Sequence, residues 1–314
     1  MKAEAPSLTI AAVERDTGIG KDALRVWERR YGFPSPGRDA HGERVYPAEQ
    51  VETLRLVKRL LDAGHRPGRL LRLRPEEILA LADAQAATQA LAASGGGPGA
   101  DLEPFMDMIL RHDAVGLRHE LARGLARLGA ARFVTELVAP LGVAVGEAWM
   151  SGRIQVFEEH SYSEEVQVVM RQAIAQMPEP PEAGHPRVLM STFPGEAHGL
   201  GLLMAETLLR LEACPCVSLG VQTPVLDIVR AAQAHHADVV AIGLTSAMGP
   251  QQIVDALGDL RDLLPDAVEL WAGGSAAVLQ RRPVAGVRAL RSLLDIPPAV
   301  RAWRDSLRGD GSRP

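Results

Sequence analysis

The residues best suited to chemistry lie in one glycine-rich stretch, Ser191-Thr-Phe-Pro-Gly-Glu-Ala-His-Gly-Leu-Gly201. Glu196 and His198 stand two residues apart within it. Imidazole is a common metal ligand, and a carboxylate that holds one ring nitrogen fixes the tautomer and raises the basicity of the other. One histidine cannot build a protein-only metal site, which needs three or four ligands. If His198 binds a metal, we therefore expect the metal to arrive inside a cofactor; the alternative is an ordinary surface or helix-start histidine.

The elements around this stretch predict a loop at the edge of a parallel sheet. The apolar run 188–190 is typical of a strand, and the apolar spacing over 200–211 predicts a helix. Further strands are expected at 217–219, 239–244, 268–271 and 287–289, separated by helices, one of which begins at Pro224 with Thr223 as its cap. This alternation predicts a doubly wound, Rossmann-like sheet with a flavodoxin-like strand order. Such sheets bind ligands at the carboxyl ends of their strands.

Two further motifs end later strands of this predicted sheet. Gly243-Leu-Thr245-Ser-Ala247 follows one, and Ala272-Gly273-Gly274 follows another. Together with Glu196-x-His198-x-x-Gly201 they resemble the B12-binding domain family, whose pattern is Asp-x-His-x-x-Gly, Ser-x-Leu and Gly-Gly. The resemblance implies a cobalamin cofactor with His198 as lower axial cobalt ligand and Glu196 as its orienting partner. It also implies binding roles for Gly201, Thr245, Gly273 and Gly274, the last three lining a slot for the nucleotide tail.

This sequence departs from the B12 pattern at three positions. Glu196 replaces the Asp and Thr245 replaces the Ser, and both keep a hydrogen-bonding group. Ala247 replaces the Leu with a smaller side chain, so the tail contact there stays open.

Residues 101–177 show helical apolar spacing throughout, which predicts a four-helix bundle. Within it Trp149 and the pair Glu159-His160 stand ten and eleven residues apart. By default Glu158 and Glu159 are expected to form a solvated helix start. This spacing resembles the light-sensing, B12-dependent MerR repressors of the CarH type. The resemblance implies that the bundle caps the upper face of adenosylcobalamin, with Trp149 against the adenosyl group, Val156 at a matching position, and Glu159 and His160 closing the pocket.

Met150 departs from that family pattern. There the Trp is followed by a His that becomes the second axial cobalt ligand after illumination. A thioether is a softer and weaker ligand than imidazole. We therefore expect light to break the cobalt–carbon bond without a second imidazole being supplied from position 150.

The N-terminal segment predicts a winged helix-turn-helix. A glycine turn, Gly18-Ile-Gly20, separates two short helical patterns, the first expected to begin at Leu8, and a Pro- and Gly-rich loop follows. The segment resembles the MerR DNA-binding domain, most specifically in Leu24-Arg-Val-Trp-Glu-Arg-Arg-Tyr-Gly32 and Arg44-Val-Tyr46. The resemblance implies that one group of residues faces the major groove and another meets the DNA backbone or minor groove. The first group is Lys21 and Arg25, and the second is Arg29, Arg30, Arg38, His41 and Arg44. The alternative is a solvated face of a small helical bundle.

The whole-chain numbers set the frame for these motifs. The 314 residues are long enough for several domains, predicted at 1–78 (head), 79–100 (linker), 101–177 (bundle) and 178–314 (B12-binding). The net charge of −5 gives the chain no overall attraction to nucleic acid. The two cysteines, Cys214 and Cys216, fit neither a zinc site nor a thioredoxin motif and suit a reducing compartment. The sequence pattern predicts no signal peptide and no membrane span, so a cytoplasmic protein is expected.

Together these features predict a non-enzymatic MerR-type regulator, of repressor type, that binds an operator in double-stranded DNA. We expect adenosylcobalamin to drive assembly of a dimer or tetramer, and light to release the DNA. A regulator that senses B12 without light, or senses something else, stays open because of Met150 and Ala247. A corrinoid carrier subunit for methyl transfer is a third interpretation, against which the helix-turn-helix argues.

Overall fold

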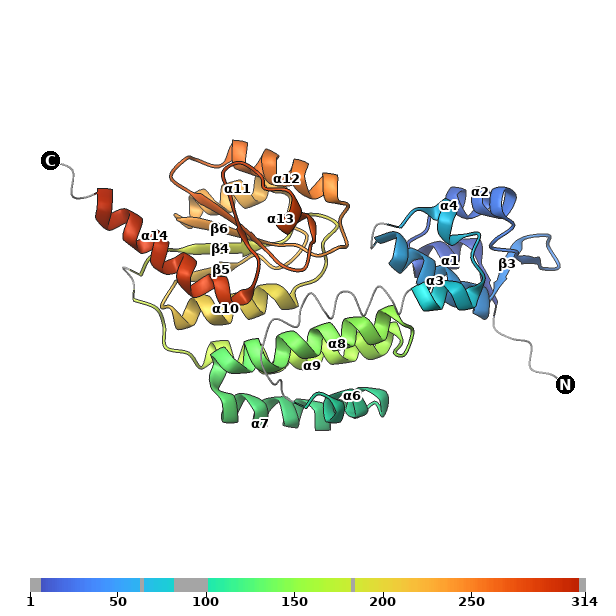
Figure 1. The fold of residues 1–314 in the computed structure, drawn as a ribbon, viewed down its shortest axis with the longest axis horizontal. Coiled ribbons are helices and arrows are strands. Elements are labelled where there is room, and N and C mark those ends of the chain that lie inside the picture. The colour runs from blue at the N-terminus through green and yellow to red at the C-terminus, as the bar shows by residue number, and fades with distance from the viewer. Residues whose placement is uncertain (1–6, 63–64, 82–100, 182–183, 311–314) are drawn as a thin grey trace. The chain divides into compact units, whose positions relative to one another are not determined.

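The computed structural model of the chain describes residues 7–62, 65–81, 101–181 and 184–310 (Figure 1). Most of the predicted linker, residues 82–100, lies outside the described residues. Contacts divide the chain into two compact units. One unit comprises Met1–Gly95 and Val143–Gln155, and the other comprises Gly96–Gly142 and Val156–Pro314. The boundaries between the four predicted segments stay a prediction.

Short helices and a small antiparallel sheet form the head. Its elements are β1 (Ser7–Thr9), α1 (Ile10–Thr17), α2 (Lys21–Tyr31), β2 (Gly37–Arg38), β3 (Arg44–Pro47), α3 (Ala48–Asp62) and α4 (Pro67–Leu70). β3 is the central strand, with β1 and β2 paired antiparallel on its two sides. Leu24, Trp27, Tyr46 and Leu54 are among the buried side chains of its core. The winged helix-turn-helix is therefore present, although Leu8, expected to begin the first helix, lies in β1.

The predicted helices of the bundle are confirmed. They are α6 (Glu103–Leu110), α7 (Ala114–Arg132), a π-helical turn η1 (Phe133–Val138), α8 (Ala139–Met150) and α9 (Val156–Ala175). α7 packs against α6 and α9, and both α7 and α9 pack against α10 (Leu200–Leu211). Arg118 on α7 binds the buried carboxylate of Glu165 on α9 through two nitrogens, with Nη2 2.9 Å from Oε1. This ion pair joins α7 to α9 within the second unit.

The run from Ala114 to Met150 is one continuous helical segment with two irregularities. Gly129 has φ 72° and ψ 160°, which kinks it, and η1 follows four residues later. By length and hydropathy alone the segment could cross a membrane. Core helices of soluble proteins satisfy the same test, and the first part of this segment packs against α6 and α9.

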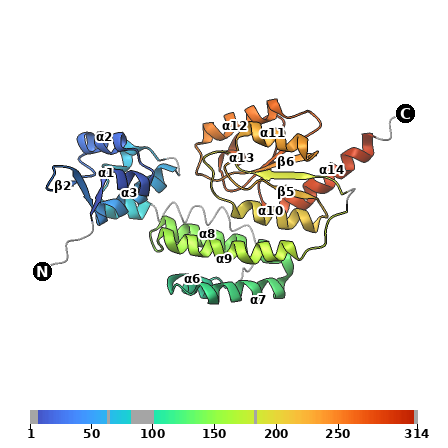
Figure 2. The ribbon, with the colours of Figure 1, turned by 180° about the vertical axis from the view of Figure 1, so that it is seen from behind.

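The C-terminal part is a five-stranded parallel sheet in the order β5-β4-β6-β7-β8. Its strands are β4 (Val188–Ser191), β5 (Cys216–Ser218), β6 (Val239–Gly243), β7 (Glu269–Gly273) and β8 (Val287–Leu290). α11 (Val225–Ala234) and α12 (Pro250–Leu263) cover one face, while α10 and α14 (Ile296–Asp310) cover the other, as Figures 1 and 2 show. The short α13 (Val278–Arg281) lies between β7 and β8 in the chain. This is the predicted flavodoxin-like order.

Candidate functional site

The strand order places two of the predicted motifs side by side. From β4, the second strand of the sheet, the chain passes to the edge strand β5 on one side and then crosses to β6 on the other. Open parallel sheets usually bind ligands in the crevice where the chain changes from adding strands on one side to adding them on the other. The loops after β4 and β6 both start at the carboxyl ends of these adjacent strands. Glu196 and Thr245 therefore meet there, although they lie 49 residues apart in the chain.

Glu196 is the centre of a dense hydrogen-bond cluster. Its side chain is fully buried, and Oε1 accepts hydrogen bonds from the backbone N–H of His198 at 3.1 Å and from Nδ1 at 2.6 Å. Oε2 accepts from the backbone N–H and the hydroxyl of Thr245, at 2.6 and 2.7 Å. Both oxygens of the carboxylate are therefore satisfied by the two motifs that the B12 resemblance pairs. The His198 side chain stays 63% exposed.

Hydrogen bonds shift the pKa values of both members of this pair. Burial is the largest influence on Glu196 and would raise its pKa, but the bonds from His198 and Thr245 outweigh it and leave that pKa lowered. The Glu196 hydrogen bond is also the largest cause of a raised His198 pKa; burial opposes it, and the charges of Glu196 and Glu159 add to it. A carboxylate that holds Nδ1–H leaves Nε2 as the nitrogen available to a metal.

The first turn of α9 brings Glu159 into electrostatic range of His198. Glu159 accepts a hydrogen bond from the Ser163 hydroxyl at 2.7 Å, and its other oxygen lies 2.7 Å from Nδ1 of His160. Val156 begins the same helix and is exposed. The structure thus gathers Glu159, His160 and Val156 on one helix end that faces the histidine loop through Glu159.

Glu158 corrects one expectation, because a solvated helix start was predicted for both glutamates. Its side chain is buried, and Oε1 lies 2.9 Å from Nε2 of His112 in the turn between α6 and α7. The His112 ring also contacts Phe157 at a centroid distance of 5.3 Å. Glu158 therefore anchors α9 to the α6–α7 turn, which leaves Glu159 as the glutamate directed to the site.

Trp149 and Met150 end α8 and belong by their contacts to the first unit, with the head. Glu159, His160 and His198 belong to the second unit. Met150 is buried. Their predicted place above the cofactor stays a prediction.

The glycines of the motifs have different structural reasons. A Cβ on Gly274, whose φ is +125°, would lie 2.1 Å from the Leu244 carbonyl oxygen. A Cβ on Gly273 would make only ordinary contacts, at 3.6 Å or more. One on Gly201 would meet nothing within 4 Å. Gly274 is thus required because its backbone lies against the backbone of Leu244, in addition to any need for space for a nucleotide tail. Gly201 faces open space.

The predicted DNA-binding residues lie on α2 and around β2 and β3. Arg29, Arg30, Arg38 and His41 are exposed. The other three form ion pairs within the head: Lys21 pairs with Glu14 at 3.2 Å, Arg25 with Asp22 at 3.1 Å, and Arg44 with Glu28 at 2.8 Å. Arg44 is only partly exposed and joins β3 to α2, which is a structural role beside the predicted contact with DNA.

Two buried hydroxyl residues at the end of β4, Ser191 and Thr192, belong to the site and were not predicted for it. Thr192 donates to the Glu196 carbonyl oxygen at 2.6 Å and accepts from the backbone N–H of Gln222 at 2.8 Å. The available signal was a polar pair directly after an apolar strand, where buried hydroxyls need partners.

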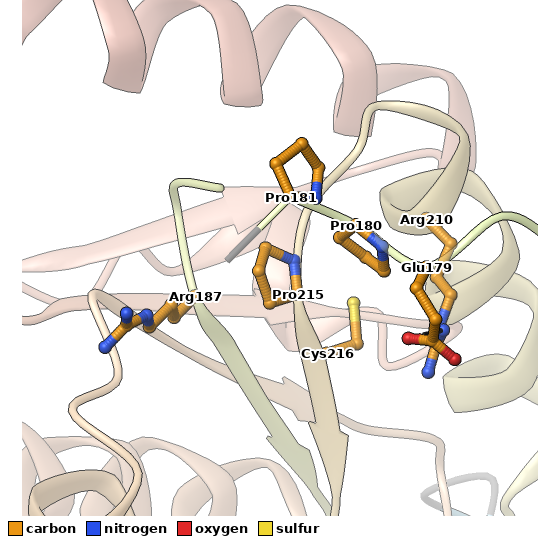
Figure 3. Close-up of a pocket in the computed structure, with 7 residues that line it drawn as sticks. All are labelled: Glu179, Pro180, Pro181, Arg187, Arg210, Pro215 and Cys216. Atoms are coloured by element: carbon orange, nitrogen blue, oxygen red, sulfur yellow. Dashed lines mark ion pairs between the residues drawn. The ribbon is translucent and has the colours of Figure 1, made fainter. Parts of the chain in front are cut away.

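A cavity of about 180 Å³ lies at the opposite, amino-terminal edge of the sheet (Figure 3). It is lined by Glu179, Pro180, Pro181, Arg187, Arg210, Pro215 and Cys216. Glu179 and Arg210 face each other as an ion pair at 3.8 Å, and the Arg187 side chain points away from the prolines (Figure 3). The lining includes none of the residues predicted for the cofactor.

The chain matches known proteins along most of its length. Residues 8–73 match the MerR HTH family regulatory protein family. The chain is 31% identical over 262 residues to the HTH-type transcriptional repressor CarH of Myxococcus xanthus, covering 83% of this chain and 86% of that one. It is 30% identical over 282 residues to the repressor CarA of the same organism, covering 86% and 88%.

Solved structures of other proteins resemble a large part of this chain. The monomethylamine corrinoid protein of Methanosarcina barkeri superposes with a TM-score of 0.53 and 17% identity, over 63% of this chain and 96% of that chain. At that identity the likeness shows a shared fold alone.

Proposed function

The chain belongs to the family of MerR-type transcriptional repressors represented by CarH and CarA, and from this membership we propose that it represses transcription under the control of adenosylcobalamin and light. The head binds an operator in double-stranded DNA, and the second unit binds the cofactor. The protein acts in the cytoplasm as a homo-oligomer whose assembly the cofactor favours. The observation that carries the cofactor assignment is the Glu196–His198–Thr245 cluster.

The donor set fits cobalamin. Among the described residues, no three His, Cys, Asp or Glu side chains converge as a metal site, so a metal held here needs ligands from elsewhere. A corrin ring supplies four of them. His198 offers one exposed imidazole whose Nδ1 is held by a buried carboxylate, and its Nε2 would be the nitrogen that binds the cobalt. Gly201 has open space around it, and Gly273 presents no side chain to the nucleotide tail beside Thr245.

Adenosylcobalamin, when bound, supplies a cobalt–carbon bond that light can break. The protein binds the cofactor, and its assembly depends on whether that bond is intact. Glu196 fixes the tautomer of His198, and Thr245 fixes Glu196. Glu159, His160 and Val156 close the site from the first turns of α9. A ligand that binds the assembled state more tightly stabilises that state, and its destruction removes the bias.

The head reads the DNA in this proposal. Lys21 and Arg25 face the major groove from the first turns of α2. The exposed side chains Arg29, Arg30, Arg38 and His41, with Arg44, meet the phosphate backbone or the minor groove. Phosphate contacts position the protein, and base contacts specify the sequence, so only one or two of these side chains need to carry specificity.

Absorption spectra test the cofactor and the signal together. The purified protein is mixed with adenosylcobalamin in the dark, freed of unbound cofactor, measured, illuminated with green light and measured again. We expect a bound spectrum with the nucleotide base detached from cobalt, an irreversible change in light, and loss of the bound form in His198→Ala. Absence of binding by the intact chain would refute the cofactor assignment.

Met150 supports a second candidate, a B12 sensor that does not respond to light. The position carries a thioether where the resemblance leads one to expect imidazole. Binding of adenosylcobalamin with the same DNA affinity before and after illumination would favour this candidate. Transfer of a methyl group from bound methylcobalamin to an acceptor would instead favour a corrinoid carrier.

A further inference from the structure

Gln222 has a backbone conformation that its place in the fold does not explain. Among the described residues, four that are not glycine have positive φ: His112, Ala213, Gln222 and His236. Three of them directly follow the C-cap of a helix, namely α6, α10 and α11. The left-handed conformation is the common way for a helix to end, so those three are ordinary. Gln222, with φ 60°, lies in the loop between β5 and α11, before the helix begins.

The strained loop is held by buried hydroxyl groups from the end of β4. The Gln222 backbone N–H donates to Thr192 Oγ1 at 2.8 Å, and the Thr223 N–H donates to the Thr192 carbonyl at 3.0 Å. Ser191 Oγ donates to Thr223 Oγ1 at 2.8 Å and lies 3.2 Å from the Gly220 carbonyl oxygen. Thr223 was expected to cap α11, but its hydroxyl serves this network and Pro224 is the N-cap. Ser191 and Thr192 are completely buried, so their hydrogen bonds hold the backbone of the loop in this conformation.

The same loop lies beside the histidine loop. A Cβ on Gly199, the residue after His198, would come within 3.3 Å of Val221 Cγ1. Thr192 bonds to both loops, since its hydroxyl donates to the Glu196 carbonyl oxygen and accepts from Gln222. The backbone that carries His198 and the backbone that carries Gln222 are therefore tied to one buried side chain.

Gln222 itself is exposed at this edge of the sheet. Backbone strain persists where the surroundings enforce it, and it concentrates at sites that clamp ligands. An exposed amide offers two donors and one acceptor oxygen. The rim of a corrin ring carries primary amides, which are the matching partners for such a group.

We propose that Gln222 is a further cobalamin-binding residue, whose side-chain amide hydrogen-bonds the amide-bearing rim of the corrin, with Thr192 as the positioning residue. This inference rests on the proposed function. It adds to the histidine loop a second contact from the β5–α11 loop, which no part of the B12 motif contains.

The test uses substitutions that separate backbone strain from side-chain contact. Gln222→Gly removes the amide and relieves the strain, and Gln222→Ala removes the amide and keeps the strain. His236→Gly is the matched control, because it relieves a similar strain at the end of α11, outside the site. All are made in the full chain, and each is titrated with adenosylcobalamin in the dark by absorbance and unfolded by heat without cofactor.

We expect both Gln222 variants to bind adenosylcobalamin roughly tenfold more weakly, as the loss of a hydrogen bond or two predicts. Gln222→Gly and His236→Gly should have thermal midpoints equal to that of the unmodified protein or up to about 2 °C higher. His236→Gly should bind adenosylcobalamin with unchanged affinity. Weaker binding by a variant that is no less stable cannot come from a damaged fold. Unchanged affinity in Gln222→Ala would overturn the inference and leave the proposed function standing. No binding by the unmodified chain would instead refute the proposed function.

Discussion

One carboxylate oxygen of Glu196 accepts two hydrogen bonds from His198, one from its backbone and one from its ring, while the other oxygen accepts two from Thr245. The residue that orients the imidazole is thus the one that holds the β4 and β6 loops together. Disturbing it should therefore change both stability and ligand binding.

Glu196→Gln tests this double role. The amide keeps the shape but presents an NH2 group to donors, so a buried donor loses its acceptor, which costs about 1–3 kcal/mol. We expect a lower thermal midpoint without cofactor and at least roughly tenfold weaker binding of adenosylcobalamin. Glu179→Gln, at a side chain that is 90% exposed, is the control and should change neither measurement. Equal stability of the two variants would contradict the structural role.

Gly273 and Gly274 should respond differently to the same substitution. Gly274→Ala forces a Cβ against the Leu244 carbonyl at a positive φ, so we expect a loss of more than about 2 kcal/mol in the free energy of unfolding. Gly273→Ala meets only ordinary contacts and should leave that free energy within about 1 kcal/mol. Denaturant unfolding of both variants decides the matter, and equal losses would show that the Leu244 contact is not the cause.

Arg29 and Arg30 should contribute to DNA affinity without sequence preference. If each meets a phosphate, its replacement by alanine should weaken binding to every duplex and lower the slope of log K against log salt by about one. Fluorescence anisotropy with the duplex upstream of its own gene and with an unrelated duplex measures both quantities. Arg127→Ala, an exposed arginine on α7, is the control. An unchanged salt slope in both head variants would remove these arginines from the interface.

Arg44→Ala is expected to act through the fold of the head as well. Its guanidinium Nε lies 2.8 Å from Glu28, and this contact raises the pKa of Arg44. Loss of the partner should loosen β3 from α2 and lower the thermal midpoint of the head, in addition to weakening DNA binding. Among the described contacts, the Arg38 guanidinium donates only to the Gly42 carbonyl, at 2.6 Å. Arg38→Ala should therefore weaken DNA binding with little change in the thermal midpoint. Equal midpoints would show that Arg44 serves DNA alone.

The Cys214 thiol should resist alkylation in the folded protein. Burial is the main cause that raises its pKa to about 11, with Arg304 opposing and Glu212 adding to the effect. At pH 8 the thiolate is then about one part in a thousand, and the rate should rise about tenfold per pH unit until the pH nears the pKa. Mass spectrometry after iodoacetamide treatment should show alkylation at least roughly 100-fold faster in denaturant. Rapid labelling at pH 8 in the folded state would contradict the buried environment.

The fold could be predicted from periodicity because each element has a strong local pattern. The alternation of strands and helices in 188–290, the glycine turn of the head and the helical spacing in the bundle all appear in the structure. What failed depended on partners distant in the chain. β1 is a strand because it pairs with β3, and Thr223 caps no helix because Ser191 takes its hydroxyl.

The same distinction applies to the site. The resemblance of the motifs to the B12-binding family implied that Glu196, His198 and Thr245 act together, and the contacts of Glu196 with both partners are present in the structure. The sequence could not predict that Glu158 faces His112 while Glu159 faces the site, since neighbouring residues on a helix differ only in the direction of their side chains. The role of Gln222 was hidden as well, because a positive φ in a loop leaves no composition signal outside glycine and asparagine.

The π-helical turn at Phe133–Val138 has a consequence for insertions and deletions. Such a turn accommodates one residue more than a regular α-helix needs over the same length. Deletion of Thr135 could regularise the helix and keep the side chains on both sides in their directions. A deletion within α8 would turn every later residue of that helix by about 100°, Trp149 and Met150 included. The turn is therefore the point at which the length of this long helical segment can vary in evolution while the two residues at its end keep their orientation.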